Sequence, residues 1–92
     1  MEKKACLIRI KGKVTGVGFR WFTLDMSSKY KSITGYVRNL CSGEVEALIQ
    51  GSFDEVELMI QGLKIGPPYA KVDSIEITPV KFDETIKNFT IR

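Results

Sequence analysis

The sequence contains no histidine among its 92 residues. It therefore lacks the side chain that most often serves as a general base near neutral pH and that most often binds metals. It has two cysteines, Cys6 and Cys41, and no segment typical of a secretory signal, so we expect free thiols rather than a disulfide. No apolar run approaches the roughly 20 residues that cross a membrane. These absences predict a cytoplasmic protein with no membrane partner.

Length and charge narrow the possibilities further. A chain of 92 residues is long enough for one two-layer core, so we expect a single domain over residues 1–92 and a monomer. The net charge of +3 favours small anions but is too weak to indicate nucleic acid, and we expect no nucleic-acid partner.

Hydrophobic periodicity defines the expected elements. Alternating apolar residues predict strands, and apolar residues at helical spacing predict two helices. In the second helix, Ser52 and Glu55 match a capping box, and Gly66 provides the stop. The expected elements are a strand over Ala5–Lys11, a helix from Phe19 to about Lys31, strands over Ile33–Leu40 and Gly43–Ile49, a helix from Phe53 to Gly66, a strand over Tyr69–Pro79 and a short strand at Phe89 and Ile91.

Two strands carry features that we expect to be visible in the fold. The third strand should direct Glu44 and Glu46 largely outward, because Val45 alternates with them toward the core. The fourth strand loses its alternation near Asp73 and Ser74, which predicts a bend or bulge.

The element order is β-α-β-β-α-β with a further C-terminal strand. This order predicts an α+β, ferredoxin-like split βαβ sandwich, in which two helices cover one face of an antiparallel sheet. Many unrelated functions use this fold, so the function has to be argued from a site.

The candidate site is the glycine-rich segment Gly12–Arg20, between the first strand and the first helix. Its glycines allow several backbone N–H groups to point into one concavity at a helix N-terminus, which suits a phosphate. Arg20 in the first helical turn opposes the helix dipole, and a bound anion would remove that penalty. These residues alone leave an alternative open. The segment could be a glycine-rich connection that binds no ligand, and Arg20 could be an ordinary surface arginine.

Two standard nucleotide motifs do not fit this segment. A Walker A loop needs Gly-Lys-Ser/Thr where this chain has Gly18, Phe19 and Arg20. A dinucleotide fingerprint needs a third glycine at the position of Trp21.

Two long motifs resemble those of the acylphosphatase family. Gly12–Arg20 is similar to the family signature G-x-V-Q-G-V-x-F-R, and Gly35–Asn39 with the following Gly43–Glu46 resembles its second signature. Gly66–Val72 also looks like the family's lead into the fourth strand, so the similarity covers essentially the whole chain. One departure is Thr15, which stands where the family usually has glutamine.

The resemblance implies a function and a role for each matching residue. The chain would hydrolyse acyl phosphates to a carboxylate and inorganic phosphate, with phosphate as product and inhibitor and with no cofactor or metal. Arg20 would bind the phosphate, and Asn39 would orient the attacking water. The implied phosphate-binding residues are Thr15, Gly16, Val17, Gly18, Phe19 and Arg20.

The expected topology agrees with this pairing. The first and second strands of a split βαβ unit run parallel, so the loop before Arg20 and the strand end at Asn39 lie at the same sheet edge. Cys6 and Cys41 would then lie roughly 15–20 Å apart, which excludes a disulfide within one chain. From turn chemistry alone, Asn39 could equally be a hairpin residue with no catalytic role.

Other functions fit the sequence less well. An RNA-recognition module shares the element order but needs aromatics on the third strand, which has none. A catalytically silent ferredoxin-like binding module is the alternative that we retain. Asp54, Glu55 and Glu57 are better explained as a solvated first helical turn than as a metal site. For Trp21 and Tyr36, packing is favoured over ligand stacking.

Overall fold

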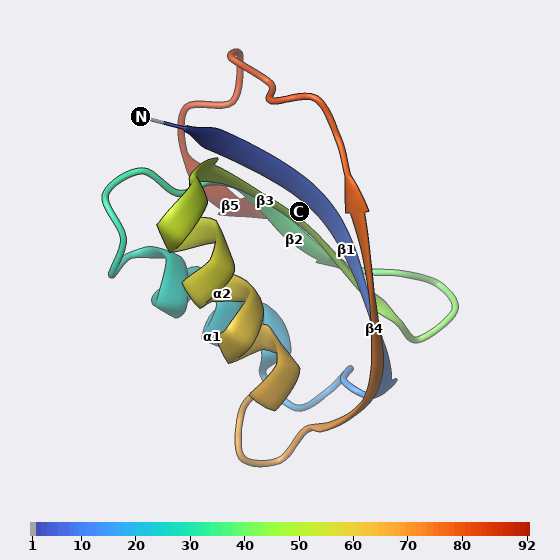
Figure 1. Cartoon of the computed structure of the whole chain (residues 1–92). Coiled ribbons are helices and arrows are strands. Elements are labelled where there is room, and N and C mark those ends of the chain that lie inside the picture. Colours follow the sequence, from blue (N-terminus) through green and yellow to red (C-terminus); the bar gives the residue numbers. More distant parts are fainter. Residues whose placement is uncertain (1) are drawn as a thin grey trace.

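The computed structural model describes residues 2–92. Its seven elements follow the predicted order (Figure 1). They are β1 (Lys3–Lys13), α1 (Phe19–Ser27), β2 (Thr34–Asn39), β3 (Val45–Ser52), α2 (Phe53–Ile65), β4 (Lys71–Pro79) and β5 (Phe89–Ile91).

The five strands form one sheet in the order β4-β1-β3-β2-β5, and both helices cover the same face (Figure 1). β1 and β2 both lie antiparallel to β3, so they run parallel to each other. The ferredoxin-like α+β prediction is confirmed. Only β5 departs from the antiparallel sheet that we expected, because it pairs parallel with β2. β4 ends at the edge of the sheet where β2 begins. Because the chain re-enters the sheet from that edge as β5, β5 runs in the same direction as β2.

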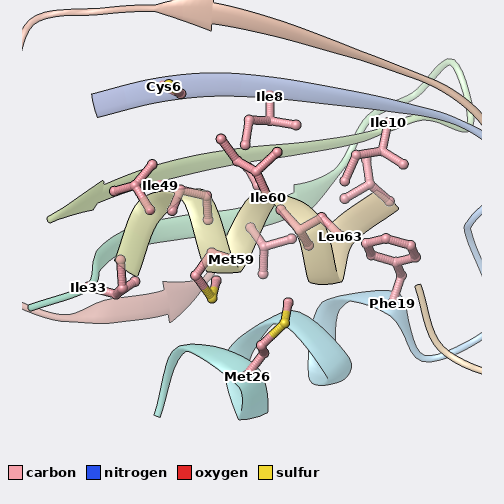
Figure 2. Close-up of a cluster of buried hydrophobic side chains, with 14 of the residues drawn as sticks. Cys6, Ile8, Ile10, Phe19, Met26, Ile33, Ile49, Met59, Ile60 and Leu63 are labelled. Carbon is pink, nitrogen blue, oxygen red and sulfur yellow. The ribbon is translucent and has the colours of Figure 1, made fainter. Parts of the chain in front are cut away.

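The core lies between the helices and the sheet (Figure 2). Alternate residues of β1 and β3 point toward the helices, and Met59, Ile60 and Leu63 of α2 pack onto them. Gly62 allows α1 and α2 to approach closely, since a Cβ atom there would collide with the Met26 side chain. Within residues 2–92, neither helix is both long and apolar enough to cross a membrane.

Helix α1 ends at Ser27, four residues before the predicted end near Lys31. The Ser27 and Ser28 hydroxyls donate hydrogen bonds of 2.6 Å to the carbonyls of Leu24 and Asp25, three residues earlier. Such bonds compete with helix continuation. Tyr30, although outside the helix, still packs against the core.

The predicted capping box of α2 is only half formed. Ser52 Oγ accepts a bond of 3.4 Å from the backbone N–H of Glu55, as predicted. The Glu55 carboxylate, however, accepts from the backbone N–H and the hydroxyl of Ser32, and the backbone N–H of Ser52 donates to Ser32 Oγ at 2.9 Å. Ser32 therefore ties the loop before β2 to the start of α2.

The strands differ from the predicted pattern in several details. β3 begins at Val45, so Gly43 and Glu44, which we expected in this strand, lie in the hairpin before it. The register between β1 and β4 shifts so that Asp73 has no partner, which confirms the predicted irregularity. β4 begins at Lys71, leaving Tyr69 outside the strand and 82% exposed. Glu46 is on the uncovered face as predicted but is only 6% exposed, because neighbouring side chains on that face cover it.

Candidate active site

The candidate phosphate loop, residues 14–18, joins the end of β1 to the start of α1 (Figure 1). Its two ends are anchored in the core by Val14 and Phe19, each 1% exposed. Between them, Gly16 and Gly18 have φ angles of 71° and 78°. A Cβ atom at either position would meet nothing within 4 Å, so the backbone conformation, rather than lack of space, accounts for these glycines.

The N-terminus of α1 lacks the side chains that usually accept hydrogen bonds from the first backbone N–H groups of a helix. Gly18 is the N-cap and supplies no side-chain cap, and the first turn contains no acidic residue. Its backbone N–H groups and the positive end of the helix dipole are therefore available to an anion. Arg20 lies in this first turn and is half-buried. None of the ion pairs formed within residues 2–92 involves Arg20.

Asn39 is the last residue of β2 and is exposed. A tight hairpin follows it, closed by bonds from Leu40 N to the Glu44 carbonyl (2.8 Å) and from Gly43 N to the Leu40 carbonyl (3.0 Å). Because β1 and β2 run parallel, this hairpin and the candidate phosphate loop lie at the same end of the sheet (Figure 1). The fold therefore brings Asn39 and Arg20 to one edge, as the topology predicted.

The remaining predicted phosphate-binding residues lie consecutively in this loop. Thr15 and Val17 are half-buried, and Gly16 and Gly18 are exposed. The Phe19 side chain packs edge-on against Phe22, with ring centroids 5.9 Å apart. Only the backbone of Phe19 is thus available to a ligand.

The cysteines and acidic residues have other surroundings. Cys6 is buried and Cys41 exposed, and both are free. Burial raises the pKa of the Cys6 thiol, which disfavours the nucleophilic thiolate. Hydrogen bonds from Ser32 lower the pKa of Glu55, which belongs to the acidic first turn of α2. Within the described residues 2–92, no three Cys, Asp or Glu side chains gather closely enough to hold a metal ion.

Trp21 is more exposed than the sequence predicted. Packing was favoured for this residue, but the side chain is 67% exposed beside Arg20. Trp21 lines a groove that adjoins the candidate phosphate loop, together with residues just before and within β5. The sequence pattern did not predict this groove, because its two walls come from segments far apart in the chain.

Comparison with known proteins decides the family. The acylphosphatase family model matches residues 6–91. This chain belongs to the acylphosphatase family. It is 40% identical over 84 residues to the acylphosphatase of Aliivibrio fischeri, covering 91% of this chain and 92% of that protein. It is 44% identical over 77 residues to the acylphosphatase of Rhodospirillum rubrum, covering 84% of each.

Structural comparison agrees with this assignment. The crystal structure of the acylphosphatase from Bacillus subtilis is similar with a TM-score of 0.90 and 31% identity, covering 97% of this chain and 98% of that one. Membership of the acylphosphatase family confirms the resemblance in the two motifs. It does not favour the alternative of a catalytically silent module.

Proposed function

We propose that this chain is an acylphosphatase that hydrolyses the carboxyl-phosphate bond of small acyl phosphates. The observation that carries the proposal is the uncapped N-terminus of α1, where the glycine loop meets Arg20 at the same sheet edge as Asn39. We further propose that residues 1–92 act as one catalytic unit, as a monomer in the cytoplasm, with neither nucleic acid nor membrane as a partner.

In this proposal residues 15–20, which span the candidate phosphate loop and the first residues of α1, hold the phosphate. The backbone N–H groups of residues 15–19 donate hydrogen bonds to the phosphate oxygens, and the helix dipole adds positive potential. The Arg20 guanidinium supplies charge-assisted bonds that can be bidentate. Thr15 takes part through its backbone, so its replacement of the family's usual glutamine leaves the cradle intact.

Asn39 is proposed to orient the attacking water. Its exposed position at the end of β2 leaves its amide oxygen free to accept a hydrogen bond from the attacking water. The water oxygen attacks phosphorus as the bond to the acyl oxygen breaks. The carboxylate departs with the electron pair of that bond, and the water proton passes to a phosphate oxygen.

This chemistry needs few functional groups. A carboxylate is a good leaving group and requires no general acid. Phosphoryl transfer depends mainly on positioning and on stabilising charge over the phosphoryl oxygens. One arginine, a set of backbone N–H groups and one amide are therefore sufficient. We propose that turnover requires no metal or cofactor and that inorganic phosphate inhibits it competitively.

Hydrolysis of acetyl phosphate by the purified protein tests this function. Turnover is measured with and without a chelator, and Arg20→Ala is purified in parallel to exclude a contaminating hydrolase. We expect turnover that is unaffected by the chelator, is inhibited by inorganic phosphate and falls strongly in the variant. Activity that disappears with chelator and returns with magnesium contradicts the proposal, as does equal activity of the variant.

A further inference from the structure

A groove of about 1040 Å³ runs beside α1 and adjoins the candidate phosphate loop at Gly18. Helix α1 provides one wall, and the segment that leads into β5 provides another. Four of its lining residues are aromatic: Trp21, Phe22, Tyr30 and Phe89. A concave surface that combines aromatic with polar side chains is typical of a small-molecule site.

The aromatic residues of the groove differ in how tightly the protein packs around them. Phe22 packs edge-on against the buried Phe19, and Phe89 packs against the hydrophobic core, so neither ring is free to move away. Trp21, in contrast, is 67% exposed, and the core leaves most of its ring available. A large aromatic side chain that is exposed beside a concave surface is well suited to stack against a ligand.

Gly18 connects this groove to the proposed phosphate site. It is the N-cap of α1 and the last residue of the loop, and it also lines the groove. In an acyl phosphate a single oxygen separates the acyl carbon from phosphorus, so the acyl group must begin within a few ångströms of the cradle. The lining extends along α1 from Gly18 to Ser28, roughly 15 Å at ~1.5 Å per residue, which is far longer than an acetyl group.

We propose that this groove binds the acyl group of the substrate and that Trp21 favours acyl phosphates carrying an aromatic ring. This inference rests on the proposed function and adds the substrate class. The groove is lined by two lysines, Lys31 and Lys87, against one carboxylate, Asp25, so its charge does not repel an anionic substrate.

Trp21 is also the only tryptophan in the chain, which gives a binding signal independent of turnover. Two unreactive analogues, in which CH₂ replaces the bridging oxygen, serve as probes: phenacylphosphonate has an aromatic acyl group, and acetonylphosphonate has an acetyl group. Both are tested as inhibitors of acetyl phosphate hydrolysis and as titrants of Trp21 fluorescence. The variants are Trp21→Ala and a control, Tyr69→Ala, whose ring is 82% exposed and does not line the groove.

We expect phenacylphosphonate to change Trp21 emission saturably at the concentration at which it inhibits, and acetonylphosphonate to inhibit without this change. Trp21→Ala is expected to shift the ratio of the two inhibition constants by about fivefold to tenfold against the aromatic analogue, and Tyr69→Ala to leave the ratio unchanged. An unchanged ratio in Trp21→Ala, or unchanged emission at saturating phenacylphosphonate, overturns the inference. In those cases acetyl phosphate hydrolysis continues, so the proposed function stands. A wild-type protein that hydrolyses no acyl phosphate overturns both.

Discussion

Arg38 donates a hydrogen bond of 2.8 Å from Nε to Oε2 of Glu46, on the sheet face that no helix covers. Tyr36 donates to the same oxygen at 2.9 Å. Burial alone would raise the pKa of Glu46, but these two hydrogen bonds and the charge of Arg38 outweigh it and hold the pKa below its usual range. These two hydrogen bonds to Glu46 therefore link β2 to β3 directly before Asn39.

Replacement of Glu46 tests the energetic weight of this cluster. We expect Glu46→Gln to lower the free energy of unfolding at neutral pH by about 1–2 kcal/mol, since bonds to a charged group are lost but Arg38 is half exposed. Because the folded pKa is lowered, this stabilisation is present above the ordinary glutamate pKa of about 4.3 and is lost as the pH falls through the folded value. Urea unfolding at several pH values measures it.

A matched control for Glu46 is Glu44→Gln. Glu44 forms ion pairs with Arg9 at 3.6 Å and Lys11 at 3.9 Å that are more exposed to solvent. Its loss is expected to cost less than about 1 kcal/mol. Equal costs for the two variants would show that the hydrogen bonds to Glu46 add nothing to an ordinary surface ion pair.

Gly18 offers a test of the loop conformation. Its φ of 78° is unfavourable for a residue with a Cβ atom, although space for that atom is open. We expect Gly18→Ala to destabilise the fold by about 1–2 kcal/mol and Gly18→Asn by less, because asparagine tolerates the left-handed region. Thermal unfolding distinguishes them. Two equally stable variants would mean that the loop readily adopts another conformation.

Arg20 is expected to bind phosphate in both the ground state and the transition state. Arg20→Ala is therefore expected to weaken inhibition by inorganic phosphate about tenfold to a hundredfold and to lower kcat, with little change in stability. Lys13→Ala is the charge-matched control, because Lys13 is an exposed cation at the end of β1. If both variants weaken phosphate inhibition equally, general electrostatic attraction rather than a specific contact binds the anion.

Local signals made much of this structure predictable. The glycines before Arg20, the Ser52 cap, the stop at Gly66 and the broken alternation at Asp73 each act through neighbouring residues, and the structure has them where the sequence placed them. The common edge of Arg20 and Asn39 followed from the parallel direction of β1 and β2 in the split βαβ unit, which is also independent of side-chain detail.

Features that depend on distant residues were not predictable. The Glu55 carboxylate turns to Ser32 instead of completing a capping box, because the fold brings that serine from 23 positions away. Burial of Glu46 requires side chains from another strand, and the exposed position of Trp21 depends on which part of α1 the sheet leaves uncovered. Helical spacing alone could not distinguish a packed Trp21 from a free one.

The kinetics of Asn39→Ala test the account most directly, with Ser42→Ala in the same hairpin as the control. Asn39 is proposed to touch the water and not the phosphate. We therefore expect kcat for acetyl phosphate to fall about a hundredfold or more, while the inhibition constant of inorganic phosphate stays within about threefold of the wild-type value. A variant with near-normal kcat and weakened phosphate inhibition would contradict the account, because Asn39 would then belong to the phosphate cradle.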